Sequence, residues 1–228
     1  GTVVELGADV PEAAGLAVGD SVVALVDSGG YAERVVAPWR QVLPLPDGVD
    51  PVAAAGLPEV AATVFSNVFM AAAAREGETL LVHGGAGGIG THAIQVARAL
   101  GLTVLATVGS DEKMRVVSEL GATPINYKDE DFVERVHELT DGHGADVILD
   151  VVGAKYLEPN LRAAATNGRI VIIGTQGGIK GELNVGRLLN KRAAVIGTTL
   201  RARPADEKAR IMAAVGEYVW PLVASGQV

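Results

Sequence analysis

Two hydrophobic periods alternate along the chain from about residue 79 onward. Short apolar runs of strand length are each followed by a segment whose apolar residues recur at helical spacing. Because the runs at 145–151 and 169–173 are almost wholly apolar, we expect a parallel sheet with helices on both faces. The pattern predicts an α/β fold with a doubly wound parallel sheet. The predicted strands are residues 79–82, 103–107, 124–126, 145–151, 169–173 and 193–197, and the predicted helices are residues 88–100, 111–120, 130–139, 155–165 and 205–219.

Residues 1 to about 48 have a β-like pattern instead. A turn feeds a predicted strand within 18–26, and a second predicted strand covers 31–37. Strands this short do not close a sheet alone, so we expect part of a β-domain whose beginning is missing. After a linker at 43–50, Asp50 and Pro51 are typical of a helix start, and alanine-rich helical sequence follows to residue 74 with an interruption near Pro58.

A glycine-rich turn joins the strand at 79–82 to the helix at 88–100. Gly85 permits the turn off the strand, Gly87 lets backbone N–H groups approach an anion, and Gly90 lets the helix pack closely on the strand. The helix N-terminus adds unpaired donors and a positive dipole end. Thr91 stands where a P-loop would need lysine, so the loop predicts a dinucleotide pyrophosphate site. The alternative is a structural glycine turn without a ligand.

In a doubly wound sheet, ligands lie beyond the carboxyl ends of the strands. An NAD site usually places a carboxylate about 20 residues after the glycine loop, but Thr107 stands there. Ser110 and Lys113 follow, a hydroxyl and a cation that suit a 2′-phosphate, so we expect NADPH rather than NAD. The alternative is that Ser110 caps a helix and Lys113 is solvated. The segments expected along one crevice are 84–90, 108–113, 126–127, 152–153, 174–178 and 198–203.

Composition narrows the class of protein. The chain has 228 residues, 49% of them hydrophobic, with a formal net charge of −8 and no cysteine. The negative charge argues against a nucleic-acid surface, and no apolar run reaches the ~18 residues that a membrane span needs. Without cysteine the chain has no disulfides, thiolate nucleophile or cysteine-ligated zinc, and we expect a cytoplasmic protein.

Six segments carry a family resemblance: 18–25, 29–33, 57–59, 79–90, 125–127 and 167–178. Together they resemble the zinc-independent quinone oxidoreductases of the medium-chain dehydrogenase/reductase superfamily, and 167–178 most resembles the subfamily inducible by a tumour suppressor in animals. The resemblance implies a partial GroES-like catalytic β-barrel domain in 1–50, a Rossmann domain in 51–200 and, in 201–228, a C-terminal helix that returns toward the catalytic domain. It also implies that the chain starts inside the barrel and stops before its closing strands.

The same resemblance assigns cofactor-binding roles. Residues 86–89 would cradle the pyrophosphate, Thr63 would lie near the nicotinamide, and 173–176 with 200–201 would flank the ribose and carboxamide. For Tyr127 the alternative is a packed aromatic side chain, and for Arg201 a solvated residue beside Arg203. The implied site comprises Thr63, Gly85, Ala86, Gly87, Gly88, Ile89, Gly109, Ser110, Lys113, Tyr127, Ile173, Thr175, Gln176, Leu200 and Arg201.

The chemistry that follows is metal-independent hydride transfer from NADPH to quinones or similar activated carbonyl or enone acceptors. We assign no catalytic residue and no metal ligand, because a quinone is already electrophilic and solvent can protonate its oxygen. We expect His83 to be a packed polar residue and His92, His137 and His143 to be surface or helix residues. The alternatives are an enoyl-thioester reductase and a non-catalytic NADPH-binding protein. We also expect a homodimer formed through the edge strand at 193–197.

Overall fold

The computed structural model describes residues 1–228 and divides into two compact units. One unit comprises Gly1–Phe65 with Leu200–Val228, and the other comprises Ser66–Thr199. A π-helix at Phe65–Ala71 carries the chain from one unit into the other. The domain division expected from the sequence stays a prediction.

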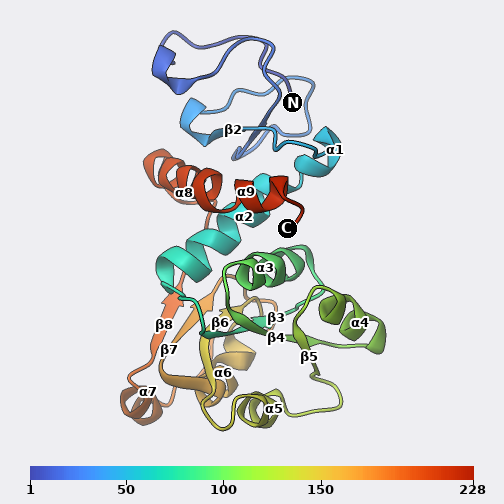
Figure 1. The fold of residues 1–228 in the computed structure, drawn as a ribbon. Coiled ribbons are helices and arrows are strands. Elements are labelled where there is room, and N and C mark those ends of the chain that lie inside the picture. The colour runs from blue at the N-terminus through green and yellow to red at the C-terminus, as the bar shows by residue number, and fades with distance from the viewer. The chain divides into compact units, whose positions relative to one another are not determined.

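The second unit is built on a six-stranded, wholly parallel sheet with the strand order β5-β4-β3-β6-β7-β8 (Figure 1). Strands β4 and β5 are added in chain order on one side of β3. The next strand, β6, pairs with the other side of β3, and β7 and β8 follow on that side. The side of the sheet on which successive strands are added therefore changes between β3 and β6, although all strands stay parallel. This is the switch point where doubly wound sheets bind ligands. The strands are β3 (Thr79–His83), β4 (Thr103–Val108), β5 (Thr123–Asn126), β6 (Ala145–Asp150), β7 (Ala164–Ile172) and β8 (Ala194–Gly197).

Helices cover both faces of this sheet, which confirms the predicted α/β fold. Leu105 and Ile148 belong to a buried cluster that includes residues of α5 (Phe132–Leu139) and α6 (Leu157–Ala163). On the opposite face lies α3 (Gly88–Ala99) (Figure 1). The remaining helices of this unit are α4 (Asp111–Glu119), the short 3₁₀ helix Ala154–Tyr156 and α7 (Val185–Lys191).

The first unit contains little sheet. Strands β1 (Val22–Ala24) and β2 (Val42–Pro44) form an antiparallel pair, extended by an isolated bridge between Thr2 and Ser21. The prediction of a strand at 31–37 is wrong, because these residues form turns and irregular backbone. The expected partial barrel is likewise present only as this two-stranded sheet, since the segment supplies too few paired strands to curve into one.

Helices make up the rest of the first unit. They are the 3₁₀ helices Glu12–Ala14 and Trp39–Gln41, α1 (Pro51–Ala54), α2 (Leu57–Val64), α8 (Ala205–Tyr218) and α9 (Trp220–Ala224). The Asp50 carboxylate accepts the Val52 and Ala53 N–H groups at 2.9 and 3.0 Å, so the predicted cap is confirmed. The Trp220 indole N–H donates to the Pro44 carbonyl at 2.8 Å and ties α9 to β2. No helix is long and apolar enough to cross a bilayer.

Candidate functional site

A pocket of about 410 Å³ lies in the second unit at the carboxyl ends of β3 to β7. It sits over the switch point of the sheet, where strand-end loops from both halves of the fold meet. Its lining combines the glycine loop after β3 with residues that follow β4, β5, β6 and β7. The lining residues are His83, Gly84, Ala86, Gly87, Gly88, Ile89, Gly90, Val108, Gly109, Lys113, Tyr127, Val151 and Gln176.

Two glycines of the loop are needed for close packing. A Cβ on Gly85 would lie 2.7 Å from the Ala106 Cβ, and one on Gly90 would lie 2.4 Å from the Gly84 carbonyl oxygen. The loop can therefore fold tightly against β4 and the start of α3 only without side chains at these positions. Gly85 itself is buried beneath the loop, and its N–H donates to the Thr107 carbonyl at 3.0 Å.

The loop also presents unpaired donors to the pocket. The first hydrogen bond into α3 is donated by the Thr91 N–H, and no side chain caps the helix. The N–H groups of Gly88, Ile89 and Gly90 consequently have no partner within the chain, and all three residues line the pocket. Unpaired N–H groups at a helix N-terminus bind anions, so this end of the pocket fits a pyrophosphate.

A cation and an aromatic ring lie on the β4–β5 side of the pocket. The exposed Lys113 ammonium has no partner within the chain, and Tyr127 is 46% exposed. A Cβ on Gly109 would lie 2.6 Å from the Tyr127 hydroxyl, so only glycine allows the ring to lie over this turn. Ser110 caps α4 by accepting the Lys113 N–H at 3.4 Å, as the alternative interpretation expected, and it does not line the pocket, although its chain neighbour Gly109 does.

The residues expected on the nicotinamide side do not all line this pocket. Gln176 lines the pocket beside Val151, and its N–H donates to the Val151 carbonyl at 3.3 Å. The Ile173 N–H is bonded to the Asp150 carbonyl at 2.8 Å and Ile173 does not line the pocket. Thr175 lines a second pocket of about 360 Å³. The structure thus brings Gln176, but not Ile173 or Thr175, to the pocket that the glycine loop lines.

Three of the expected site residues belong to the first unit. The Thr63 hydroxyl donates to the Glu59 carboxylate at 2.9 Å, so the Leu-Pro-Glu motif is linked to the next turn of its helix. The Arg201 guanidinium donates to the Asp27 carbonyl at 3.2 Å, and the Leu200 carbonyl accepts the Arg203 N–H at 3.1 Å. Their cofactor contacts stay predictions.

A buried polar network lies behind the pocket and was not foreseen from the sequence beyond His83. The ring of His83 bonds to the Thr107 hydroxyl at 2.9 Å and to the Asn160 amide at 2.7 Å. The Asn160 amide in turn donates to the Asp150 carboxylate at 3.0 Å. Polar residues directly after apolar strands, Asp150 above all, were the available signal.

Burial sets the charge states in and near this network. It lowers the pKa of His83 to about 4, against a smaller opposing effect of the Asn160 hydrogen bond. It raises the pKa of the Asp150 carboxyl, and N–H donors from Val152, Gly153 and Asn160 oppose that rise. At neutral pH His83 is therefore an uncharged imidazole.

The other histidines differ from one another. His92 is a helix residue of α3, as one of the two alternatives expected, but it is not on the surface: its side chain is buried and its Nε2 has no partner. Burial lowers the pKa of His92 to about 4. His143 is exposed and bonds to Asp146, and His137 bonds to the Gly142 and Arg162 carbonyls. No group of three or more histidine, aspartate or glutamate side chains in residues 1–228 could hold a metal ion.

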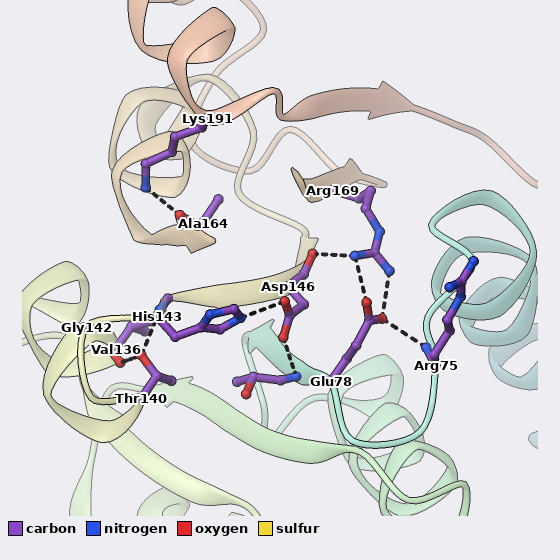
Figure 2. A network of polar contacts seen from close by, with 12 residues as sticks. Arg75, Glu78, Val136, Thr140, Gly142, His143, Asp146, Ala164, Arg169 and Lys191 are labelled. Carbon is purple, nitrogen blue, oxygen red and sulfur yellow. Dashed lines mark hydrogen bonds and ion pairs between the residues drawn. The ribbon is translucent and has the colours of Figure 1, made fainter. Parts of the chain in front are cut away.

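A second polar cluster stands at the other end of the sheet (Figure 2). Arg169 donates two hydrogen bonds to the Glu78 carboxylate at 3.0 and 2.7 Å, and the Asp146 carboxylate accepts the Thr79 N–H at 2.9 Å. Glu78, Thr79 and Asp146 lie at the amino ends of β3 and β6, and Arg169 of β7 is paired with Val147 of β6 and with Ala194, the first residue of β8, away from the strand ends that form the pocket. The cluster is therefore structural.

The strand order, the switch point and the glycine loop define a Rossmann-type dinucleotide-binding fold. Comparison with known proteins agrees. A family model described as zinc-binding dehydrogenase matches residues 88–216. The quinone oxidoreductase of Rattus norvegicus is 35% identical over 183 residues, which are 79% of this chain and 54% of that protein.

Two further relatives bear on the fold and on the chemistry. The crystal structure of Escherichia coli quinone oxidoreductase complexed with NADPH has a TM-score of 0.84 and 29% identity, covering 100% of this chain and 69% of that one. The highly reducing polyketide synthase azaB of Aspergillus niger is 36% identical over 178 residues, 76% of this chain and 7% of that protein. The chain spans about half the length of the curated quinone oxidoreductases that it matches.

The chain belongs to the zinc-binding dehydrogenase family, and within the medium-chain dehydrogenase/reductase superfamily it is a member of the zinc-independent, quinone oxidoreductase-like kind.

Proposed function

We propose that this protein binds NADPH and transfers a hydride from it to quinones or similarly activated carbonyl or enone acceptors. One observation carries the proposal. The unpaired N–H groups of 88–90 and the unpartnered Lys113 ammonium line the same pocket. A ligand that satisfies both has an anionic group at the helix N-terminus and a second anionic group at the β4–β5 side, as NADPH does. Relatives named quinone oxidoreductase, one of them solved with NADPH, support the proposal.

The chain's residues would divide the coenzyme between them. Residues 86–89 would hold the pyrophosphate through backbone N–H groups. Lys113 and Tyr127 would hold the 2′-phosphate, with the hydroxyl of Ser110 still able to donate to it. Gln176 and Val151 would lie along the second half of the coenzyme. We propose that Thr63, Gly85, Gly109, Ile173, Thr175, Leu200 and Arg201 complete or support the site, as the family resemblance implies.

Hydride transfer to a quinone needs few further groups from the protein. NADPH supplies the hydride when it is bound, and a quinone ring is electrophilic enough to accept it. The contribution of the chain is then to fix the coenzyme in one orientation and to keep water away from it. We assign no catalytic acid and no metal, and we expect solvent to protonate the reduced acceptor.

Coenzyme titration tests the site directly. We expect the protein to bind NADPH about tenfold or more tightly than NADH, because the added phosphate meets a free ammonium. In the double variant S110D/K113A a carboxylate replaces the hydroxyl and the ammonium is lost, so the preference should disappear or reverse. Equal affinity of the unmodified protein for both coenzymes would contradict the proposed 2′-phosphate site.

Turnover tests the acceptor class. NADPH oxidation should be observed with members of a panel of quinones and enones, without added metal. If no quinone or enone in the panel supports NADPH oxidation by the protein, the proposed acceptor class is wrong.

A second candidate is reduction of an enoyl thioester, in which the hydride goes to the β-carbon. The match to a highly reducing polyketide synthase favours it. The same coenzyme site would serve, so the candidates differ only in the acceptor. Higher kcat/KM for a short enoyl thioester than for any quinone would select this second candidate.

The proposal also includes a cytoplasmic homodimer. The edge position of β8 supports pairing between two copies.

A further inference from the structure

Four buried polar side chains behind the pocket form one continuous chain of hydrogen bonds. Thr107, His83, Asn160 and Asp150 come from β4, β3, α6 and β6, and each is at most 1% exposed. Burying polar groups costs free energy unless every donor and acceptor is paired. A fully paired chain of buried polar side chains at the strand ends therefore indicates a role that apolar packing would not serve.

The direction of the chain follows from its end at Asp150. That carboxylate accepts N–H groups from Val152 at 2.6 Å and Gly153 at 3.1 Å, and the Asn160 amide nitrogen at 3.0 Å. With its nitrogen committed to Asp150, Asn160 presents its amide oxygen to His83. The Nε2 atom of His83, 2.7 Å from that oxygen, must therefore carry the proton.

The remaining links are then determined. An uncharged imidazole protonated on Nε2 has a lone pair on Nδ1, which can only accept. The Thr107 hydroxyl donates to it at 2.9 Å and in turn accepts the Gly84 N–H at 3.4 Å. The lowered pKa of His83 agrees with an uncharged ring. Edge-on contacts with Phe132 and Tyr156, at centroid distances of 5.0 and 4.8 Å, hold the ring in place.

The two ends of this chain are the two loops that meet at the switch point. One end is Gly84, where the glycine loop leaves β3, and Thr107 also holds Gly85 through its carbonyl. The other end is the turn at 151–153, which Asp150 fixes by accepting two of its N–H groups. Gly84 and Val151 both line the pocket, and a Cβ added at Gly84 would lie 3.4 Å from the Val151 side chain.

We propose that His83 is a positioning residue for the coenzyme: as the Nε2-protonated tautomer it links the glycine loop to the turn after β6 and fixes their separation, so that a dinucleotide can contact both at once. This inference rests on the proposed function. A site whose two halves are held in place before binding loses less entropy when the ligand binds, so breaking the link weakens ligands that span both halves more than ligands that touch one.

Nitrogen NMR tests the tautomer without any variant. In the protein at neutral pH we expect the Nε2 of His83 to carry the proton and Nδ1 to show the shift of an unprotonated nitrogen. A proton on Nδ1, or on both nitrogens, would overturn the proposed link.

A matched pair of variants tests the positioning role. Thr107→Val removes the hydroxyl with little change in shape, and Thr107→Ser keeps it. We compare NADPH with adenosine 2′,5′-bisphosphate, which lacks the second phosphate, the second ribose and the nicotinamide. We expect T107V to bind NADPH about tenfold more weakly than the unmodified protein, as expected for loss of a buried hydrogen bond, and T107S to bind within about twofold. The affinity for the bisphosphate should change by less than about twofold in both variants, because that ligand touches one half of the pocket.

The outcomes separate this inference from the proposed function. If the unmodified protein does not bind NADPH, the proposed function falls and the positioning role falls with it. If it binds NADPH, and T107V binds both ligands as the unmodified protein does or weakens both equally, only the positioning role is overturned. Should T107V fail to fold, the tautomer seen in the unmodified protein decides.

Discussion

The glycines of the loop are required for different physical reasons. A Cβ at Gly90 would meet the carbonyl oxygens of Gly84 and Gly85 at 2.4 and 2.6 Å, both of them backbone atoms that cannot turn aside. A Cβ at Gly88 would meet nothing within 4 Å. Both positions lie in the first turn of α3, so alanine variants at the two positions can be compared directly.

Gly90→Ala should lower the free energy of unfolding by about 2 kcal/mol, the usual cost of forcing a methyl group into a packed site. Gly88→Ala should leave it unchanged or raise it slightly, because alanine is the better helix former. Urea unfolding of the two variants measures this. Equal stability would show that the backbone relaxes around residue 90.

The two buried histidines predict a dependence of stability on pH. Burial lowers the pKa of both His83 and His92 from the ordinary value of 6.5 to about 4. The unfolded chain therefore binds more protons between these two values, so stability is full above pH 6.5 and is lost as the pH falls toward 4. Lowering the pH from 7.5 to 5 should cost about 2 kcal/mol for each histidine.

His92→Gln separates this effect from that of the carboxyl groups. The raised pKa of Asp150 acts in the opposite direction, because a carboxyl that is easier to protonate when folded gains stability as the pH falls. Both proteins share that contribution, so the difference between their unfolding curves at several pH values isolates His92. A variant whose stability falls with pH as steeply as that of the unmodified protein would disprove the prediction.

At the residue scale, the sequence located the pocket lining where it follows a strand along the chain. Residues of the glycine loop, Lys113 in the first turn of α4 and Tyr127 after β5 line the pocket, and their roles toward a cofactor stay predictions. The hydrogen bond between His83 and Asn160 joins residues 77 positions apart, and no local sequence pattern predicts it. The burial of His92 was missed because its face of α3 is decided by packing.

At the scale of elements, the two ends of the parallel sheet have separate tasks. Strand carboxyl ends carry the pocket, and the amino ends carry the cluster around Arg169 and Glu78 (Figure 2). Arg169 also donates to the carbonyls of Ala72, Ala73 and Asp146, so it joins the strand starts to the preceding segment.

Arg169→Met should lower the free energy of unfolding by about 2–3 kcal/mol, because it removes the cation paired with Glu78, whose remaining donor is the Arg75 N–H, and leaves several carbonyls without the Arg169 donor in a largely buried place. NADPH affinity should not change, since the cluster lies away from the pocket. Arg135→Met removes the exposed pairs with Glu130 and Glu138 and is the control, with an expected cost of about 1 kcal/mol or less. Thermal unfolding and coenzyme titration of both variants check this, and a large loss of affinity in R169M would refute the division between the two ends.

Periodicity predicted the elements of the second unit well because each buries an apolar face. All six strands were found, as were the helices between β3 and β7, although β7 begins at Ala164 and not at 169. The helix α7 was missed because it has no buried residue to mark a periodic pattern. The prediction of a strand at 31–37 was wrong because the apolar residues of this segment are exposed and no strand of the first unit pairs with it.

At the scale of the whole molecule, the two edges of the sheet are unequal. In β5 the positions facing outward are Pro124, which has no N–H, and Asn126, whose N–H is bonded to the Glu130 carboxylate at 3.4 Å. That edge is closed to further pairing. In β8 the N–H of Thr198 donates to Ile172, so by alternation those of Val195 and Gly197 point away from β7 and have no partner.

An open edge of this kind is where we propose that two copies pair. Val195→Pro removes one outward N–H at a position where an edge strand accepts proline, so it should convert a dimer into a monomer, with some loss of stability because the Val195 side chain packs against the buried cluster. Val195→Thr keeps both the N–H and the β-branched shape and should remain dimeric. Sedimentation velocity at micromolar concentration distinguishes the two states. A monomeric unmodified protein would exclude the pairing, and a dimeric V195P variant would place the contact elsewhere, because a strand that lacks the donor cannot form the same ladder with its copy.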